Sequence, residues 1–91
     1  MRESKVEKSV VNYFKEEGGI AYKFVSPGRR GVPDRIGLLP IHEKHRAIVN
    51  RYVKFIECKA PGGRLEPWQK REQERLKSMG FETTIVDRSV K

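Results

Sequence analysis

The chain contains little apolar material and no long hydrophobic run. Hydrophobic residues account for 36% of its 91 residues and aromatic residues for 9%, and the hydrophobic share is below that of an average globular domain. No stretch approaches the roughly 18 consecutive apolar residues of a membrane-spanning helix. The first ten residues, "MRESKVEKSV", lack the apolar segment of a secretory signal peptide. We therefore expect a cytoplasmic protein with no membrane partner.

Cysteine is also nearly absent. The lone Cys58 excludes an intramolecular disulfide, which fits a reducing, intracellular setting. A single cysteine can also act as a nucleophile. Cys58 stands between Glu57 and Lys59, however, and alternation along a strand directs its side chain away from theirs. We predict a buried structural thiol at this position.

Charge dominates what is present. Charged residues make up 35% of the chain, and 20 lysines and arginines against 12 acidic residues give a net charge of +8. This excess favours a polyanionic partner, most simply nucleic acid. The alternative is a basic soluble domain with no such partner. The length allows one small domain, residues 1–91, whose modest core makes self-association reasonable.

The pattern of apolar residues and turns predicts an α/β chain with elements in the order α-β-β-β-α-β. Val6, Val10, Tyr13 and Phe14 form one stripe of an amphipathic helix that ends at Gly18. A later helix, 68–80, has helical spacing at Trp68, Leu76 and Met79. Predicted strands cover 20–25, 34–41, 52–60 and 81–87, with a basic loop at 26–33 and an ambiguous segment, a hairpin turn or strand extension, at 42–51.

The stretch "FIECKAPGG" at 55–63 carries the candidate chemistry. Glu57 and Lys59 lie two residues apart in a strand, so both point to the same face. Asp34 opens the preceding strand, and neighbouring strands lie about 4.8 Å apart. The two carboxylates, with the backbone carbonyl of Cys58 and waters, would suit Mg²⁺. Lys59 would orient or help to deprotonate the attacking water.

Each of these features also has a simpler interpretation. Glu57 and Lys59 could be solvated charges that protect a strand edge. Arg35 could pair with a carboxylate to shape the site, and Trp68 could stack on bases, although packing of the last helix on the sheet is favoured for it. The basic residues could contact DNA phosphates, or they could be solvent-exposed charges of a loop with no ligand. The candidates for DNA contact are Lys23, Arg29, Arg30, Arg35 and Arg64.

Two segments of the chain resemble a known family. "KFVSPGRRGVPDRIGLLP" and "FIECKAPGGRLEPWQKREQERLKSMGF" are similar to the VRR-type (virus-type replication-repair) nuclease domain of the PD-(D/E)xK superfamily. The resemblance covers nearly the whole chain and is strongest to the short stand-alone members of phages and bacteria. It implies a small restriction-endonuclease-like mixed sheet flanked by helices, and a phosphodiesterase dependent on Mg²⁺ or Mn²⁺. It also implies an organisation like that of Holliday-junction resolvases, with a homodimer.

The resemblance assigns roles position by position. Asp34 matches the metal-binding aspartate, Glu57 the second metal ligand and Lys59 the catalytic lysine. Gln69 matches a glutamine close to the site, and Glu7 matches a glutamate of the first helix that also contributes to the metal site.

The first helix leaves a choice open, and the middle of the chain departs from the pattern. Glu7 has the alternative of an exposed helix residue, and Glu3 competes for its role. Relatives usually join the two strands with a short glycine turn, whereas residues 41–52 are longer. The hairpin geometry and the dimer contacts are therefore open at this stage.

These observations predict a metal-dependent DNA endonuclease, acting on branched DNA such as four-way junctions. A monomer of this length has a radius of gyration of roughly 12 Å, too small to hold two duplex arms. A two-fold dimer would match the symmetry of a junction. The alternatives are a nuclease without structure preference and a non-catalytic DNA-binding module. An RNA-binding domain lacks support, because no paired aromatic platform is recognisable.

Overall fold

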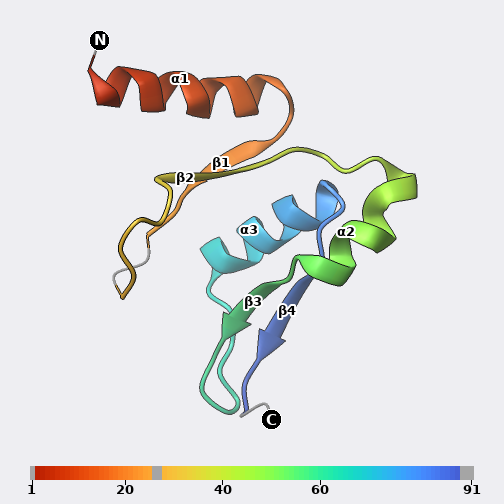
Figure 1. Ribbon diagram of the computed structural model, residues 1–91. Coiled ribbons are helices and arrows are strands. Elements are labelled where there is room, and N and C mark those ends of the chain that lie inside the picture. The colour runs from red at the N-terminus through yellow and green to blue at the C-terminus, as the bar shows by residue number, and fades with distance from the viewer. Residues whose placement is uncertain (1, 26–27, 89–91) are drawn as a thin grey trace. The chain divides into compact units, whose positions relative to one another are not determined.

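The structure, a computed structural model, describes residues 2–25 and 28–88 (Figure 1). Ser26 and Pro27 of the predicted basic loop lie outside the described residues. Within the described ranges no helix is long and apolar enough to cross a membrane. The elements are α1 (Glu3–Glu16), β1 (Ile20–Lys23), β2 (Arg35–Leu38), the 3-10 helix η1 (Glu43–His45), α2 (Arg46–Tyr52), β3 (Phe55–Cys58), α3 (Pro67–Ser78) and β4 (Thr83–Val86).

The strands pair two by two. β1 runs antiparallel to β2, and β3 runs parallel to β4. The predicted α/β class, with strands of both orientations, is confirmed. The chain forms two compact units, Met1–Pro40 and Ile41–Lys91, each holding one strand pair. That β2 lies beside β3 in a single sheet, and that the whole chain is one domain, stay predictions.

In the first unit, α1 packs against the β1–β2 pair (Figure 1). Phe14 contacts β2 at Gly37, where a Cβ atom would overlap the phenyl ring, so only glycine fits there. The half-buried face of α1 is formed by Glu7, Val11 and Phe14, at i, i+4 and i+7. Ala21 and Leu38 are buried in the strand pair. This small core fixes which side of the helix meets the strands.

The predicted apolar stripe of α1 is therefore only partly right. Phe14 packs as expected, but Val6, Val10 and Tyr13 are exposed. The stripe that packs lies one residue further along, which rotates the helix by about 100°. Apolar residues occupy both adjacent stripes, so periodicity alone does not distinguish them. In the stripe that packs, Glu7 forms an ion pair with Arg35 of β2.

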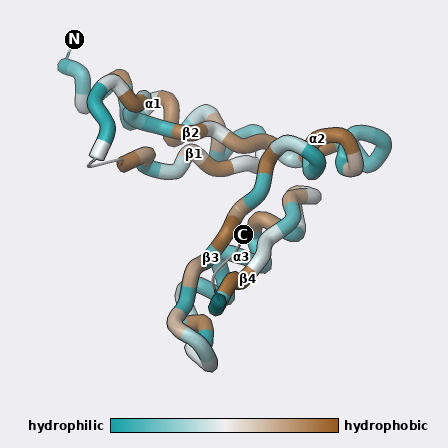
Figure 2. The backbone as a smooth tube through the Cα atoms, turned by 60° about the horizontal axis from the view of Figure 1, so that its bottom comes forward, coloured by the Kyte–Doolittle hydropathy of each residue, from teal (hydrophilic) through white to brown (hydrophobic). Residues whose placement is uncertain are grey.

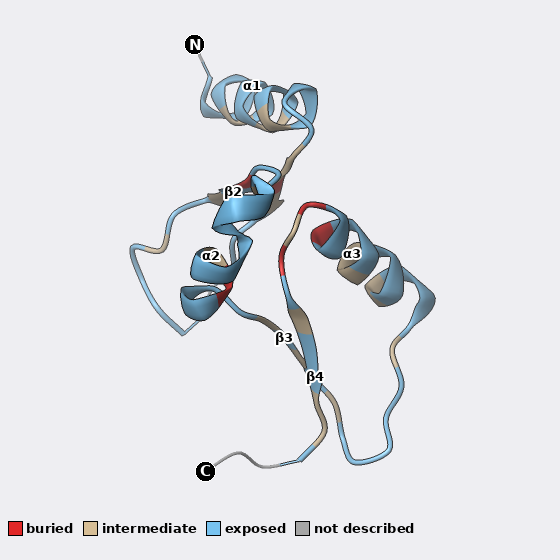
Figure 3. Ribbon diagram, turned by 90° about the vertical axis from the view of Figure 1, so that its right-hand side faces the viewer, coloured by how far each residue is buried: buried red, intermediate tan, exposed pale blue. Residues whose placement is uncertain are grey.

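The second unit is a parallel βαβ arrangement in which α3 connects β3 to β4. Leu76, Met79 and Phe81 form its buried core, near the end of α3 and the connection to β4 (Figure 3). The Phe55 ring meets the Phe81 ring edge-on, with centroids 5.5 Å apart. This contact ties the start of β3 to the core.

The ambiguous segment is helical rather than a hairpin or a strand extension. It comprises η1 and α2. The buried Asn50 donates through Nδ2 to the Gly80 carbonyl at 2.9 Å and accepts through Oδ1 from the Glu82 backbone N–H at 3.1 Å. Arg46, one turn earlier, lies against Gly80. Polar groups at i and i+4 thus meet the chain between α3 and β4. In a helix these positions lie about 6 Å apart along the axis, whereas in an extended segment they would lie about 13 Å apart.

Two predictions of burial are wrong. Figure 2 shows the apolar stretch of β3 after a hydrophilic segment, but Cys58 is exposed. The face of β3 that carries Phe55 packs against Phe81, so Cys58 takes the opposite face. Trp68 is 59% exposed. It precedes the buried Leu76 by eight residues, about 80° round the helix, whereas the half-buried Gln69 is only about 20° away.

Candidate active site

Glu57 and Lys59 lie on the same half-buried side of β3. The ladder with β4 continues past the end of the strand, because the Lys59 N–H donates to the Val86 carbonyl at 2.9 Å. Successive residues of a strand turn their backbone groups to alternate edges, so those of Cys58 point away from β4. The Cys58 carbonyl, a predicted metal ligand, is therefore not used by this ladder.

The charges of Glu57 and Lys59 are not paired with each other or with neighbours. Across residues 2–25 and 28–88, neither side chain takes part in a hydrogen bond or an ion pair. By contrast, Lys54, just before the same strand, forms an ion pair with Glu82 at 2.9 Å. An acid and a base on one half-buried face thus remain available for a ligand.

A tight turn follows Lys59 and determines its surroundings. The Gly63 N–H donates to the Ala60 carbonyl at 2.8 Å, and Gly62 has φ of +78°. With Pro61 before it, this is a type II turn, which requires a positive φ at its third residue. A Cβ atom on Gly63 would lie 3.2 Å from the Lys59 Cβ. Glycine at this position lets the returning chain approach the side chain of Lys59.

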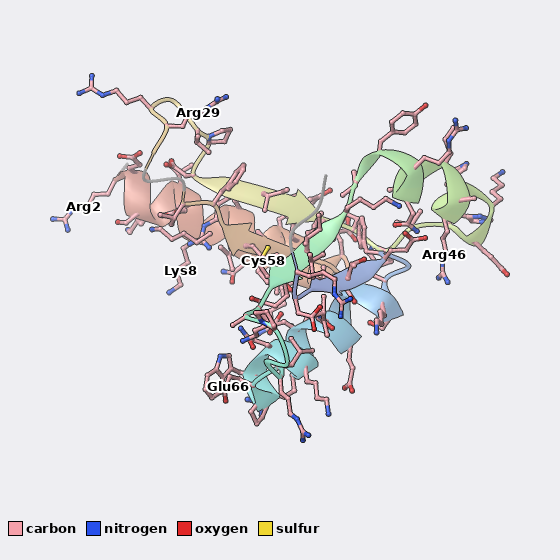
Figure 4. All side chains as sticks on the ribbon, turned by 90° about the horizontal axis from the view of Figure 1, so that it is seen from below. Arg2, Lys8, Arg29, Arg46, Cys58 and Glu66 are labelled. Atoms are coloured by element: carbon pink, nitrogen blue, oxygen red, sulfur yellow. The ribbon has the colours of Figure 1, made fainter. Side chains whose placement is uncertain are left out.

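Gln69 lies at the start of α3, where its side chain accepts from the Glu66 backbone N–H at 2.9 Å. The Glu66 side chain accepts in return from the Gln69 backbone N–H, which completes a capping box. Figure 4 labels Glu66 at the beginning of this helix. The Gln69 carbonyl oxygen is therefore committed to the cap, and its amide NH₂ is the group left to donate. Its role near the site stays a prediction.

In the first unit, Glu7 is occupied by an ion pair. Arg35 Nε donates to Glu7 Oε1 at 2.9 Å, and the two side chains are only 26% and 27% exposed. A second guanidinium nitrogen of Arg35 donates to the Ala21 carbonyl at 3.3 Å. Arg35 thus pairs with a carboxylate, one of the two interpretations of this residue. Glu3, the competing residue, is exposed in the first turn of α1.

Asp34 directly precedes β2. Its backbone carbonyl accepts from the Phe24 N–H at 2.9 Å, which extends the β1–β2 pairing. Its exposed carboxylate has no hydrogen-bond or ion-pair partner among the described residues. The candidate DNA contacts Lys23, Arg29, Arg30 and Arg64 are likewise exposed. Figure 4 shows Arg29 on the loop between the first two strands, with its side chain directed outward.

Asp34 belongs to the first unit and Glu57 to the second, so a shared cation stays a prediction. The donors themselves suit one: two carboxylates without partners and a backbone carbonyl outside the β3–β4 ladder are the hard oxygen ligands of Mg²⁺. Within the described part of the chain, no three His, Cys, Asp or Glu side chains form a metal cluster. Waters would fill the remaining coordination positions, as is usual for Mg²⁺.

Asp87 is a neighbour of Lys59 that the sequence did not indicate. It directly follows β4, and continuation of the β3–β4 register places it beside Lys59. It is half-buried, and its carboxylate accepts from Arg88 Nε at 3.4 Å. The only signal in the sequence is an acid at the end of a strand, which gains meaning once β4 is known to run parallel to β3.

Comparisons with known proteins bear on the class of protein. The α/β fold is consistent with a small nuclease of mixed α/β structure. No family model and no solved structure matches the chain. The putative nuclease p44 of Acyrthosiphon pisum secondary endosymbiont phage 1 is 47% identical over 87 residues, which cover 96% of this chain and 84% of that protein. The chain belongs to the same nuclease family as this phage protein.

Proposed function

We propose that the protein is a DNA endonuclease that hydrolyses phosphodiester bonds and depends on Mg²⁺ or Mn²⁺. The observation that carries the proposal is the pair Glu57 and Lys59, which share one half-buried face of β3 without partners among the described residues. The phage relative, 47% identical and named putative nuclease p44, supports the reaction class. The donor chemistry of Asp34, Glu57 and the Cys58 carbonyl supports the choice of metal.

The residues divide the work of the reaction. Asp34, Glu57 and the Cys58 carbonyl would hold the ion, which supplies positive charge beside the scissile phosphate. Lys59 orients the attacking water or helps to remove its proton, and its charge stabilises the additional negative charge at phosphorus. The water oxygen forms the new bond to phosphorus, the bond to the ester oxygen breaks, and that oxygen leaves with the electron pair and takes up a proton.

The remaining candidates serve binding or support. Exposed Arg29, Arg30 and Arg64 contact phosphates, for which guanidinium groups are well suited. Lys23 is the weaker candidate of this group, and Arg35 shapes the first unit through Glu7. Because Glu7 is already paired, it supports the site through Arg35 next to Asp34 or exchanges this partner for the metal. The Gln69 amide donates to the site from the start of α3.

We propose in addition that the substrate is branched DNA and that two copies act together. The support is the small size of the chain, the symmetry that a two-fold dimer shares with a four-way junction, and the family resemblance of the two sequence segments. A monomeric mass by light scattering at micromolar concentration would count against junction resolution.

The test compares a labelled four-way junction with a linear duplex of the same arm sequence, in Mg²⁺, in Mn²⁺ and in EDTA. We expect paired, symmetric cuts in the junction only, lost in EDTA. Equal cutting of both substrates would keep the nuclease and overturn the preference for branched DNA. Binding without cutting in either metal, at saturating protein, would instead establish a non-catalytic DNA-binding module.

A further inference from the structure

The tryptophan of the chain lies outside its core. Trp68 is the only tryptophan in the sequence, and it is 59% exposed at the second position of α3, after Pro67. The buried side of the same helix is formed by Leu76, with Gln69 and Gln73 half-buried beside it. An indole is the largest apolar side chain, and packing it would contribute more to stability than any other residue of this helix. Its place on the outer side leaves the face of the indole available to a ligand.

Positive charge exceeds negative charge in the sequence around this indole. Between residues 64 and 72 the cations are Arg64, Lys70 and Arg71, all exposed, and the carboxylates are Glu66 and Glu72. Glu72 pairs with Arg75 at 3.8 Å. The Glu66 carboxylate is engaged by the capping box. Arg71 stands three residues after Trp68, so the two side chains are neighbours on the helix surface. An exposed aromatic ring among exposed cations favours a ligand that offers both a flat ring and phosphates.

The indole is also close to the proposed site along the chain. Trp68 follows Lys59 by nine positions, which bounds the distance between their Cα atoms at about 30 Å even for extended chain. The type II turn at residues 60–63 reverses the chain within this stretch, so the true separation is well below that bound. A nucleic acid held by the catalytic face of β3 would reach the start of α3 within a few nucleotides.

We propose that Trp68 stacks on an unpaired base of the DNA substrate, while Arg64, Lys70 and Arg71 contact the flanking phosphates. The inference rests on the proposed function for the kind of substrate and deepens it. Any base presents a flat face to an aromatic ring, so such stacking tolerates every sequence. In an intact duplex each base is already stacked on its neighbours. Trp68 therefore favours DNA with unpaired nucleotides, such as branch points and single-stranded ends.

Because Trp68 is the only tryptophan, its fluorescence reports on the contact directly. The full chain is titrated in EDTA, which prevents cutting, with single-stranded oligothymidylate or with a blunt duplex of equal length. Binding is followed in parallel by the anisotropy of labelled DNA. We expect strong quenching at saturation with the single strand and little with the duplex. Equal quenching by both, or none at saturating single strand, would overturn the inference.

Variants test the energetic weight of the contact. Trp68→Ala should weaken binding of the single strand about tenfold and binding of the duplex less than twofold, and Trp68→Phe should retain part of the difference. Tyr52→Ala is the matched control, because Tyr52 is an exposed aromatic residue at the end of α2. Equal losses for both DNA forms in Trp68→Ala, or the same selective loss in Tyr52→Ala, would contradict the proposal.

Failure of this inference and failure of the proposed function are distinguishable. Quenching by single strands without any cutting in Mg²⁺ or Mn²⁺ would support stacking and overturn the nuclease. DNA cleavage without any quenching of the Trp68 fluorescence would support the nuclease and overturn stacking. A shift of the tryptophan emission with protein concentration in the absence of DNA would identify a second copy as the occupant of this surface, against the proposal.

Discussion

Two adjacent glycines in the turn after β3 should respond differently to substitution by alanine. A Cβ atom on Gly63 would lie 2.9 Å from the Ala60 carbonyl oxygen and 3.2 Å from the Lys59 Cβ. Ordinary contacts between carbon atoms are about 3.5–4.0 Å, so Gly63→Ala must move the turn or Lys59 by several tenths of an ångström. A Cβ atom on Gly62 would meet no atom within 4 Å, but the φ of +78° at this position disfavours any residue with a side chain.

The two alanine variants should therefore fail in different ways. A left-handed residue costs roughly 1–2 kcal/mol when it is not glycine, so Gly62→Ala should lower the free energy of unfolding by about that amount while the folded protein still cuts. Because a misplacement of about 1 Å can cost a hundredfold in rate, the smaller shift in Gly63→Ala should lower the cleavage rate about tenfold. Single-turnover cleavage and urea unfolding measure the two effects. Wild-type cleavage by Gly63→Ala would refute the idea that this turn positions Lys59.

Three further predictions concern the rest of the chain. Asn50→Ala leaves the Gly80 carbonyl and the Glu82 N–H without their partner, so unfolding in urea should show a loss of about 2–4 kcal/mol; a loss below 0.5 kcal/mol would contradict the role of α2. A double-mutant cycle of Glu7→Ala and Arg35→Ala in urea unfolding should give a coupling free energy of about 1 kcal/mol, and the Mg²⁺ concentration needed for cleavage should not change. A change in that Mg²⁺ concentration without coupling would make Glu7 a metal ligand. Arg29→Ala with Arg30→Ala should weaken DNA binding and flatten its salt dependence, and unchanged affinity would place the DNA elsewhere.

Local signals in the sequence were sufficient to predict much of the structure of the second unit. The Pro-Gly-Gly run predicts the turn after β3, and the same-face spacing of Glu57 and Lys59 follows from strand geometry alone. Contacts between distant segments were not predictable in this way. The helix α2 depends on Asn50 meeting Gly80 and Glu82 across about 30 residues, and no local pattern reports such a partner.

The errors have the same origin. Trp68 looks like a core residue because its size favours burial, but the side of α3 that packs is the one with Gln69 and Leu76. Cys58 looks buried because β3 is apolar, but the face that packs is the one with Phe55. For the site, the candidate residues could be named from the sequence. Whether Glu7 and Arg35 are free or paired could not be predicted from the sequence, because that depends on the rotation of α1 against β2.

The measurement that tests the central claim most directly compares Lys59→Ala with Lys54→Ala. Both remove a lysine of the same segment, but Lys54 is exposed and pairs with Glu82, a surface contact of small weight. DNA binding is measured in EDTA and cleavage in Mg²⁺ at saturating protein. The account predicts that Lys59→Ala binds normally and cuts at least about a hundredfold more slowly, while Lys54→Ala stays within twofold of wild type. Undiminished cutting by Lys59→Ala at equal binding, or wild-type cutting that persists in EDTA, would contradict it.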